Sequence, residues 1–191
     1  MIWSARLCLG LILLGWAGAL YKSLRAIKKR KWILDRSSPP PTEDVSLSII
    51  IPARNEEKGI DRCVLSARDQ DHKDLQIIVL DDASSDDTPR ILAHHASNDD
   101  RVTVLTGDGS PLPDGWFGKP WALQRAQSGA RGEWLLFIDA DVELDPVAAS
   151  RTLGYALEHE LDMITGLGEM EMESFWEKVL QPAGGRVDPC W

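Results

Sequence analysis

Cysteine and histidine are scarce in this 191-residue chain, which has three cysteines and four histidines. The cysteines Cys8, Cys63 and Cys190 lie far apart, without the close spacing of a zinc site or a redox pair. A disulfide-stapled domain is therefore excluded, and so few thiols are typical of a reducing compartment. We expect Cys63 to be a small buried residue and the histidines to lie at the surface.

Positive charge is scarce outside the first 36 residues. Residues 1–36 carry eight Lys or Arg and one Asp, a net charge of +7, whereas the remaining 13 basic and 29 acidic residues give −16. Nucleic acid is repelled by such an acidic body, so we expect no nucleic-acid partner. Acidity does not exclude anionic substrates, because a bound metal ion can reverse the local field.

Long apolar runs are also lacking, apart from one near the beginning of the sequence. Leu7 to Tyr21 is an uncharged stretch of 15 residues, which residues 1–4 extend if Arg6 reaches the interface. Basic residues follow this stretch, unlike in a cleaved signal, and place the body in the cytoplasm. We expect residues 1–36 to form a single helix and basic flank in the inner or plasma membrane. A helix lying in the membrane surface is the alternative.

Strands and helices alternate after a polar, proline-rich linker at residues 37–44. Apolar runs predict strands at residues 47–51, 75–80, 101–106, 133–138 and 162–165. Helical spacing predicts helices at residues 57–70, 86–97, 120–130 and 145–158. Continuous apolar strands are typical of a parallel sheet covered by helices on both faces. The sequence thus predicts an α/β, Rossmann-like domain over residues 45–182 and an irregular tail at residues 183–191.

Two carboxylates, Asp139 and Asp141, stand where the apolar run at residues 134–138 ends. Residues two apart on an extended chain point the same way, so the pair favours a shared cation. Oxygen ligands on a short loop suit Mg²⁺ or Mn²⁺, which take further ligands from water and substrate phosphates. Such triplets also occur by chance, and we interpret Asp69-Gln70-Asp71 as a solvated helix end. A strand end favours the metal site, because ligands of open α/β sheets bind there.

Two further polar clusters follow strands, and a parallel sheet brings strand ends to one edge. The clusters are Pro52-Ala53-Arg54-Asn55-Glu56-Glu57 and Asp81-Asp82-Ala83-Ser84-Ser85-Asp86-Asp87-Thr88. Arg54 suits a base or a phosphate, or else a surface salt bridge with Glu56 or Glu57. Asp82 suits a base or a ribose hydroxyl, or else the turn and helix cap in which such clusters are common. Lys119, before a predicted helix, suits a diphosphate or is a solvated lysine.

Taken together at their spacings, these motifs resemble family 2 glycosyltransferases of the GT-A fold, which transfer a sugar from a nucleotide diphospho-sugar. The matching runs are Ile-Ile-Pro-Ala-Arg-Asn-Glu-Glu at 50–57, Asp-Asp-Ala-Ser-Ser-Asp at 81–86, Gly-Lys-Pro-Trp-Ala-Leu at 118–123 and Phe-Ile-Asp-Ala-Asp at 137–141. The resemblance implies that Pro52, Ala53, Arg54, Asn55 and Asp82 hold the base and ribose, with Glu56 beside them in the nucleotide-sugar site. It also implies the diphosphate near Lys119, the ribose and sugar near Asp139, and the metal on Asp141.

The same resemblance implies a UDP-sugar donor, a Mg²⁺ or Mn²⁺ cofactor and inversion at the anomeric carbon. It implies an acceptor at the membrane, either a lipid or a polyprenyl- or hopanoid-type molecule. The N-terminal helix, the Gly-Trp-Phe-Gly-Lys loop at 115–119 and the run Glu-Ser-Phe-Trp-Glu at 173–177 are similar to the hopanoid-associated members of the family.

One part of the family pattern is missing from the sequence. The family's general base lies in a Glu-Asp pair well downstream of the Asp-x-Asp, and processive members carry Gln-x-x-Arg-Trp; neither follows Asp141. The run Glu169 to Glu173 alternates like an edge strand with its glutamates in solvent. We therefore expect a C-terminally truncated or frameshifted product that lacks the acceptor half, and the catalytic residues are unknown. The alternative function is a non-catalytic, membrane-tethered remnant that binds a nucleotide sugar.

Two other classes fit the sequence less well. A sugar-nucleotide pyrophosphorylase would need a Gly-rich, Arg-containing phosphate loop after its first strand, where this chain has Pro-Ala-Arg-Asn-Glu. A signalling receiver domain would need its lysine after a late strand, whereas Lys119 precedes the fourth predicted strand.

Overall fold

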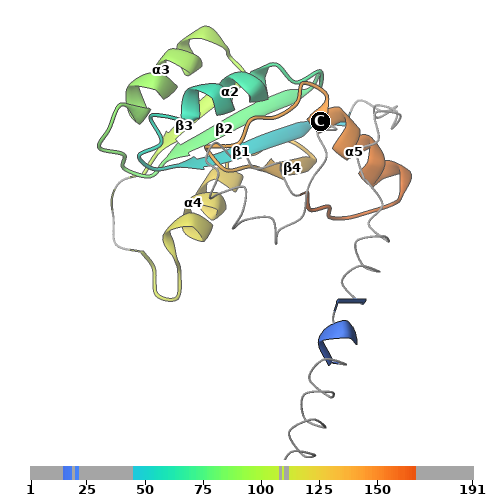
Figure 1. Ribbon diagram of the computed structural model, residues 1–191. Coiled ribbons are helices and arrows are strands. Elements are labelled where there is room, and N and C mark those ends of the chain that lie inside the picture. Colours follow the sequence, from blue (N-terminus) through green and yellow to red (C-terminus); the bar gives the residue numbers. More distant parts are fainter. Residues whose placement is uncertain (1–14, 19, 22–44, 108, 110–111, 167–191) are drawn as a thin grey trace, which may run out of the picture. The chain divides into compact units, whose positions relative to one another are not determined.

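The computed structural model describes residues 15–18, 20–21, 45–107, 109 and 112–166 (Figure 1). Of the expected membrane segment, only residues 15–18, 20 and 21 are described, and they are helical. Within the described part of the chain, no helix has the length and apolar character needed to cross a bilayer. The predicted linker at 37–44, the run at 169–173, the motif at 173–177 and the tail at 183–191 lie outside the described residues.

Four parallel strands form the sheet in the order β3-β2-β1-β4 (Figure 1). The strands are β1 (Leu47–Ala53), β2 (Leu75–Asp81), β3 (Val102–Thr106) and β4 (Trp134–Phe137). Both central strands are buried along nearly their whole length, as their unbroken apolar sequences predict. The register pairs Ala53 with Asp81, so the polar runs after β1 and β2 leave the sheet side by side.

Helices cover both faces of this sheet, which confirms the predicted α/β architecture. They are α2 (Ile60–Arg68), α3 (Thr88–Asn98), α4 (Gly118–Gln127) and α5 (Ala148–Glu158). Alternate residues of a strand point to opposite faces. Ile49 and Ile51 accordingly belong to the core that includes α2, α3 and α5, whereas Ile50 packs with α4. In Figure 1, α2 and α3 lie over one face of the sheet and α4 over the other.

Some boundaries differ from the predicted ones for local reasons. The first strand was predicted at residues 47–51, but β1 continues through Pro52 to Ala53. The carbonyl of Ile50 accepts the Ile138 N–H on the β4 side, and Pro52, two residues on, faces the same side beyond the last β4 pairing. Its missing N–H therefore interrupts no pairing. The strand predicted at residues 162–165 is wrong: these residues form no strand, and Met163 is 82% exposed.

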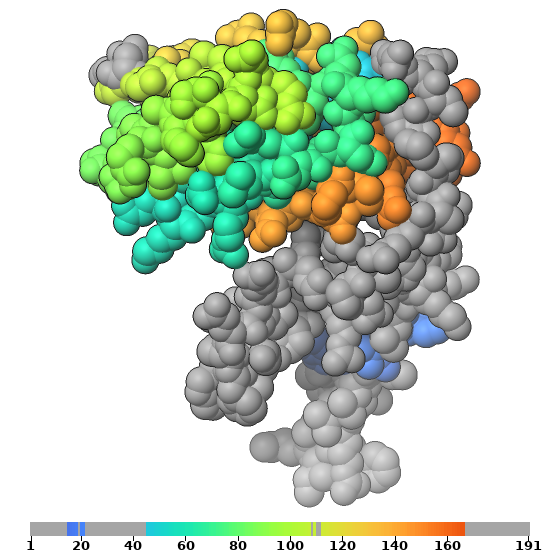
Figure 2. All heavy atoms as spheres, turned by 90° about the horizontal axis from the view of Figure 1, so that it is seen from above, coloured from blue at the N-terminus to red at the C-terminus, as the bar shows by residue number. Residues whose placement is uncertain are grey.

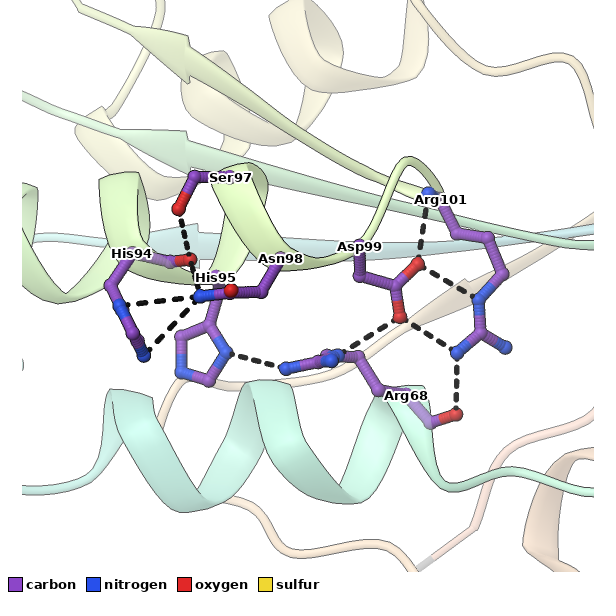
Figure 3. A network of polar contacts seen from close by, with 7 residues as sticks. All are labelled: Arg68, His94, His95, Ser97, Asn98, Asp99 and Arg101. Atoms are coloured by element: carbon purple, nitrogen blue, oxygen red, sulfur yellow. Dashed lines mark hydrogen bonds and ion pairs between the residues drawn. The ribbon is translucent and has the colours of Figure 1, made fainter.

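A polar network joins α2, α3 and the start of β3 (Figure 3). Arg68 Nε donates to Asp99 Oδ2 at 2.9 Å, and Arg101 Nη2 donates to the same oxygen at 2.8 Å. His95, expected at the surface, is buried, with Nε2 2.9 Å from Asp61 Oδ1 and Nδ1 3.3 Å from Arg68 Nη1. That expectation is wrong because distant residues of α2 supply both ring nitrogens with polar partners, which removes the penalty of burying them.

We expect Asp99→Asn to lower the free energy of unfolding by about 1–3 kcal/mol at pH 7. Hydrogen bonds from Arg101 and Arg68 hold the pKa of the Asp99 carboxyl well below its usual range, against the opposing effect of its partial burial. A carboxyl with a lowered pKa stabilises the folded state above its unfolded value of about 4, and this contribution is lost as the pH falls through the folded pKa.

Urea unfolding at pH 7 and at lower pH measures both effects of Asp99→Asn. The difference in the free energy of unfolding between Asp99→Asn and the wild-type chain should become smaller as the pH falls. Asp100→Asn is the control, because Asp100 is exposed and adjacent. A destabilisation of the same size at pH 7 and at pH 2 would contradict this account of Asp99.

Candidate functional site

Two loops are locked together where β1 and β2 end: the first loop, residues 54–59, and the second loop, residues 82–88. Three successive N–H groups of the first loop, at residues 55, 56 and 57, donate to oxygens of Ser84 (2.9 Å), Thr88 (2.9 Å) and Asp86 (3.1 Å). In return, Asn55 Oδ1 accepts from the Ser85 N–H at 2.8 Å. The first loop thus receives its shape from side chains of the second loop, about 30 residues away in sequence.

Both loops begin with an unusual backbone conformation. Asn55 and Ala83 have φ angles of 57° and 56°, in the left-handed region that non-glycine residues rarely adopt. Asparagine tolerates this region better than alanine does, and each such residue costs on the order of 1–3 kcal/mol. The hydrogen bonds of residues 84 and 85 to Asn55 flank both positions and offset this cost. Strain of this kind clusters at binding sites.

The second loop forms the turn before α3 that its Asp/Ser-rich sequence suggested, and it also contacts the first loop. Asp86 Oδ1 accepts from the Thr88 N–H at 3.0 Å at the start of α3, as a helix-capping group does. Asp86 Oδ2 accepts from the first loop. Although desolvation opposes the change, hydrogen bonds from Thr88 and Glu57 lower the pKa of the Asp86 carboxyl. The cap and the contact between the loops therefore use the same side chain.

Arg54 and Asp82 face each other across the two loops. Arg54 Nη1 lies 3.5 Å from Asp82 Oδ2. Among the described residues, the salt bridge of Arg54 is therefore with Asp82 rather than with Glu56 or Glu57. Arg54 is largely exposed, so its guanidinium group is accessible to a ligand. Gly107 follows β3 and packs closely here, because a Cβ atom at this position would lie 3.0 Å from Asp82 Oδ1. Two residues predicted to hold the base and ribose are thus neighbours.

Lys119 and Asp139 form a second solvent-accessible ion pair, with Nζ 2.5 Å from Oδ1. More than half of each side chain is exposed. An exposed pair of this kind contributes little to stability, so either group can exchange its partner for a ligand. The contact joins the beginning of α4 to the loop that follows β4. Lys119 is solvated, as its sequence context also allowed, and it is paired with another predicted site residue.

Three carboxylates surround the buried thiol of Cys63. Burial in the first place, and then the negative charges of Asp141, Asp139 and Glu56, together raise the pKa of this thiol to about 12. Among the residues that the structure describes, no group of three or more His, Cys, Asp or Glu side chains is arranged to hold a metal ion. The exposed carboxylate of Asp141 instead fits a hard cation that takes its remaining ligands from phosphate and water.

The predicted site residues come together at one edge of the sheet. Ala53 differs from the others, because it contributes through its backbone and not through its side chain. Ala53 is buried, and its carbonyl accepts the Asp82 N–H at 2.8 Å, so it supports the second loop through its backbone. Sequence reasoning did not single out Ser84, Ser85, Thr88 and Gly107. The serines and Thr88 lie in the recognised Asp/Ser cluster, whereas nothing local distinguishes Gly107 from an ordinary loop glycine.

The sequence of this chain matches a known protein family and is similar to curated proteins. The model of the family "Glycosyl transferase family 2" matches residues 48–183. The GalNAc(5)-diNAcBac-PP-undecaprenol beta-1,3-glucosyltransferase of Campylobacter jejuni is 37% identical over 99 residues, which are 51% of this chain and 30% of that protein.

Two solved structures share the arrangement of strands and helices. The mannosyltransferase PcManGT from Pyrobaculum calidifontis, in complex with GDP-Man and Mn²⁺, superposes with a TM-score of 0.63 at 24% identity over 78% of this chain and 42% of that chain. S. aureus TarS in complex with UDP-GlcNAc superposes with a TM-score of 0.53 at 24% identity over 68% of this chain and 37% of that chain.

The chain spans less than half the length of each of these three proteins. The structural likenesses show a GT-A-like fold, as the motifs imply. Because the family match covers more than half of the chain and includes both loops, Lys119 and the Asp139–Asp141 pair, this protein belongs to glycosyl transferase family 2.

Proposed function

We propose that this protein binds a nucleotide diphospho-sugar at the edge where β1, β2 and β4 end, and transfers the sugar. The observation that carries the proposal is the convergence of the first loop, the second loop, Lys119 and the Asp139–Asp141 pair in a member of glycosyl transferase family 2. Structures of similar fold that contain GDP-Man or UDP-GlcNAc support a nucleotide sugar as the ligand class. A UDP-sugar is the proposed donor.

The base and ribose would lie against residues 52–56 and Asp82. Arg54, being exposed, can turn its planar guanidinium group towards the base or a phosphate. Lys119 would exchange Asp139 for the diphosphate, and Asp139 would then accept hydrogen bonds from the ribose and the sugar. This exchange keeps a charged partner on the lysine throughout, so little electrostatic energy is lost when the donor enters.

Asp141 is the proposed protein ligand of Mg²⁺ or Mn²⁺. Its exposed carboxylate suits a cation that keeps several waters and binds substrate phosphates. When bound, the ion would neutralise negative charge that develops on the departing nucleoside diphosphate. The protein's own contribution is to hold the donor and its diphosphate in one orientation, with Lys119 as the fixed positive charge.

The acceptor is proposed to be a lipid or a polyprenyl- or hopanoid-type molecule at the inner or plasma membrane. Its hydroxyl group would attack the anomeric carbon of the donor with inversion, as the nucleoside diphosphate departs from that carbon. The apolar stretch at residues 7–21 with its basic flank supports a membrane helix and a cytoplasmic body. The name of the C. jejuni relative, which includes PP-undecaprenol, supports a lipid-linked acceptor. Between Asp141 and Gly166, in the described part of the chain, no Glu-Asp pair is present to serve as the general base.

We expect Asp141→Ala to weaken the binding of UDP-GlcNAc in the presence of Mn²⁺ by about tenfold or more, which is ~1.4 kcal/mol. Without Mn²⁺, the affinities of variant and wild-type chains should be similar, because only the metal-dependent part is lost. Calorimetric titration of the full chain, with GDP-Man as a second ligand, measures this. Glu143→Ala is the control, because Glu143 is an exposed carboxylate two residues away. Equal affinities of wild type and Asp141→Ala with Mn²⁺ would overturn the metal assignment.

Lys119→Met should weaken UDP binding both with and without Mn²⁺, since it removes a positive charge from the diphosphate itself. A charged hydrogen bond is worth about 1.5–3 kcal/mol, so we expect a loss of about tenfold to a hundredfold. Lys119→Arg should retain most of the affinity. Unchanged binding of UDP to Lys119→Met would exclude Lys119 from the diphosphate site.

An assay for the release of UDP from UDP-GlcNAc distinguishes an active transferase from a protein that only binds the donor. Metal-dependent release by the wild type, lost in Asp141→Ala, would support catalysis. Metal-dependent binding with no release above background, with lipid acceptors present, would favour the binding-only alternative.

A further inference from the structure

Helix α2 is packed on three sides, and each side contacts a different part of the protein. With about 100° between successive residues, positions 60, 64 and 67 share one face, 61 and 68 a second, and 63, 66 and 70 a third. The first face, of Ile60, Val64 and Ala67, is buried in the core against the sheet. The second face, of Asp61 and Arg68, contacts His95 of α3. Figure 3 shows the contact of Arg68 with His95.

The third face contacts the segment that follows β4, residues 139–149. Cys63 Sγ donates to the carbonyl of Asp139 at 3.4 Å, and Ser66 Oγ accepts from the Leu144 N–H at 3.0 Å. Gln70, just past the end of the helix, donates to the carbonyl of Asp145 at 2.8 Å and accepts from the Ala149 N–H at 2.9 Å. Three side chains thus bond to four backbone groups. Figure 2 shows this segment, in orange, beside the green atoms of α2.

The side chains on this face are well suited to fixing a backbone. Cys63, Ser66 and Gln70 are all buried. Every buried side-chain nitrogen and oxygen in the described residues has a hydrogen-bond partner. Removing one partner here would leave a desolvated backbone group without a bond, which is unfavourable. The segment is therefore held in one position rather than resting loosely on the helix.

The strand before this segment cannot hold it alone. β4 has four residues, its pairing with β1 ends at Phe137, and Phe137 is 45% exposed. After the bond from the Ile138 N–H to Ile50, the chain leaves the ladder of β1. Asp139 and Asp141 therefore stand beyond the paired part of the sheet, and the contacts with α2 follow at once.

Close packing at the beginning of the helix adds to this restraint. A Cβ atom on Gly59 would lie 3.2 Å from the carbonyl oxygen of Ala140 and 3.2 Å from the Cα atom of Asp141. Gly59 is also the last residue of the first loop, so the loop assigned to the base and the backbone of the Asp139–Asp141 pair meet at the first turn of α2.

We propose that Cys63, Ser66 and Gln70 are positioning residues of the donor site. From the third face of α2, they hold the backbone that presents Asp139 and Asp141, and so they determine the metal-dependent part of donor binding. This inference rests on the proposed function, because it assigns the metal to Asp141. It adds three residues that touch neither donor nor metal, together with the element that joins the base side of the site to the metal side.

Hydrogen exchange of the ligand-free, full-length chain tests the structural half of this proposal. Ser66→Ala should lower the protection of the Leu144 amide, and Gln70→Ala that of the Ala149 amide, each by about tenfold or more, the loss expected for one hydrogen bond. Amides of β1 and β2 should keep their protection. Wild-type protection at Leu144 in Ser66→Ala and at Ala149 in Gln70→Ala would overturn the proposal, whatever the protein binds.

Titration of UDP-GlcNAc with and without Mn²⁺ tests the functional half. Partners that orient metal ligands typically contribute about 10–100-fold to metal affinity. We therefore expect Ser66→Ala and Gln70→Ala to reduce the gain in affinity that Mn²⁺ confers by about tenfold, with metal-free UDP-GlcNAc binding unchanged. Gln70→Met, which removes the hydrogen bonds to Asp145 and Ala149 at a similar side-chain length, serves if Gln70→Ala does not fold.

Two control variants act on the opposite side of the same helix. Arg68→Ala and Asp61→Ala weaken the contact of α2 with α3 and leave the third face intact. They should lower the unfolding temperature without changing the gain from Mn²⁺. The positioning role would be overturned if Mn²⁺ conferred an equally reduced gain in UDP-GlcNAc affinity on the controls and the third-face variants. It would also be overturned if neither group showed a reduction in this gain.

The wild-type titration keeps this proposal separate from the proposed function. A wild-type chain that binds UDP-GlcNAc without any gain from Mn²⁺ would refute the metal assignment and, with it, the functional half of the inference. A wild-type gain that survives intact in Ser66→Ala and Gln70→Ala would refute the inference alone.

Discussion

The parallel pairing of β1 with β2, in a register that ends both strands together, is the constraint on which the rest of the structure depends. Because Ala53 and Asp81 are partners, the residues that follow them emerge within hydrogen-bonding distance. The side chains of Ser84, Asp86 and Thr88 can then bond to three consecutive N–H groups of the first loop. A shift of one residue would also turn the core face of a strand away from its helices.

Charge at this edge is balanced by contacts between elements. Arg54 of the first loop pairs with Asp82 of the second loop. Lys119, at the beginning of α4, pairs with Asp139, which follows β4. Both cations lie opposite carboxylates and are accessible to solvent, so an anionic ligand can replace the carboxylate without leaving the cation unpaired. An acidic protein can therefore still bind an anion at this edge, because the charges close to the ligand have more influence on binding than the net charge of the domain.

The sequence was sufficient for the parts of this architecture that local chemistry determines. Apolar runs gave four of the five predicted strands, and the rule that parallel strands end at one edge brought Arg54, Asp82 and Asp139 into one candidate site. The strand predicted from the short run at residues 162–165 was wrong, because its few apolar residues do not pair with any strand in the described part of the chain. His95 and Gln70 were placed in solvent although both are buried, since their partners come from elements 27 to 79 residues away. No local sequence pattern predicts contacts between residues so far apart in the sequence.

The packing of α2 on three sides restricts which sequences the helix can accept. Its sheet face requires apolar side chains of fixed size, and its other two packed faces require particular donors and acceptors. Leu65, on the remaining exposed stripe, can change with little effect on these contacts. A helix of nine residues, ordinary in its sequence, is therefore among the least mutable parts of the domain.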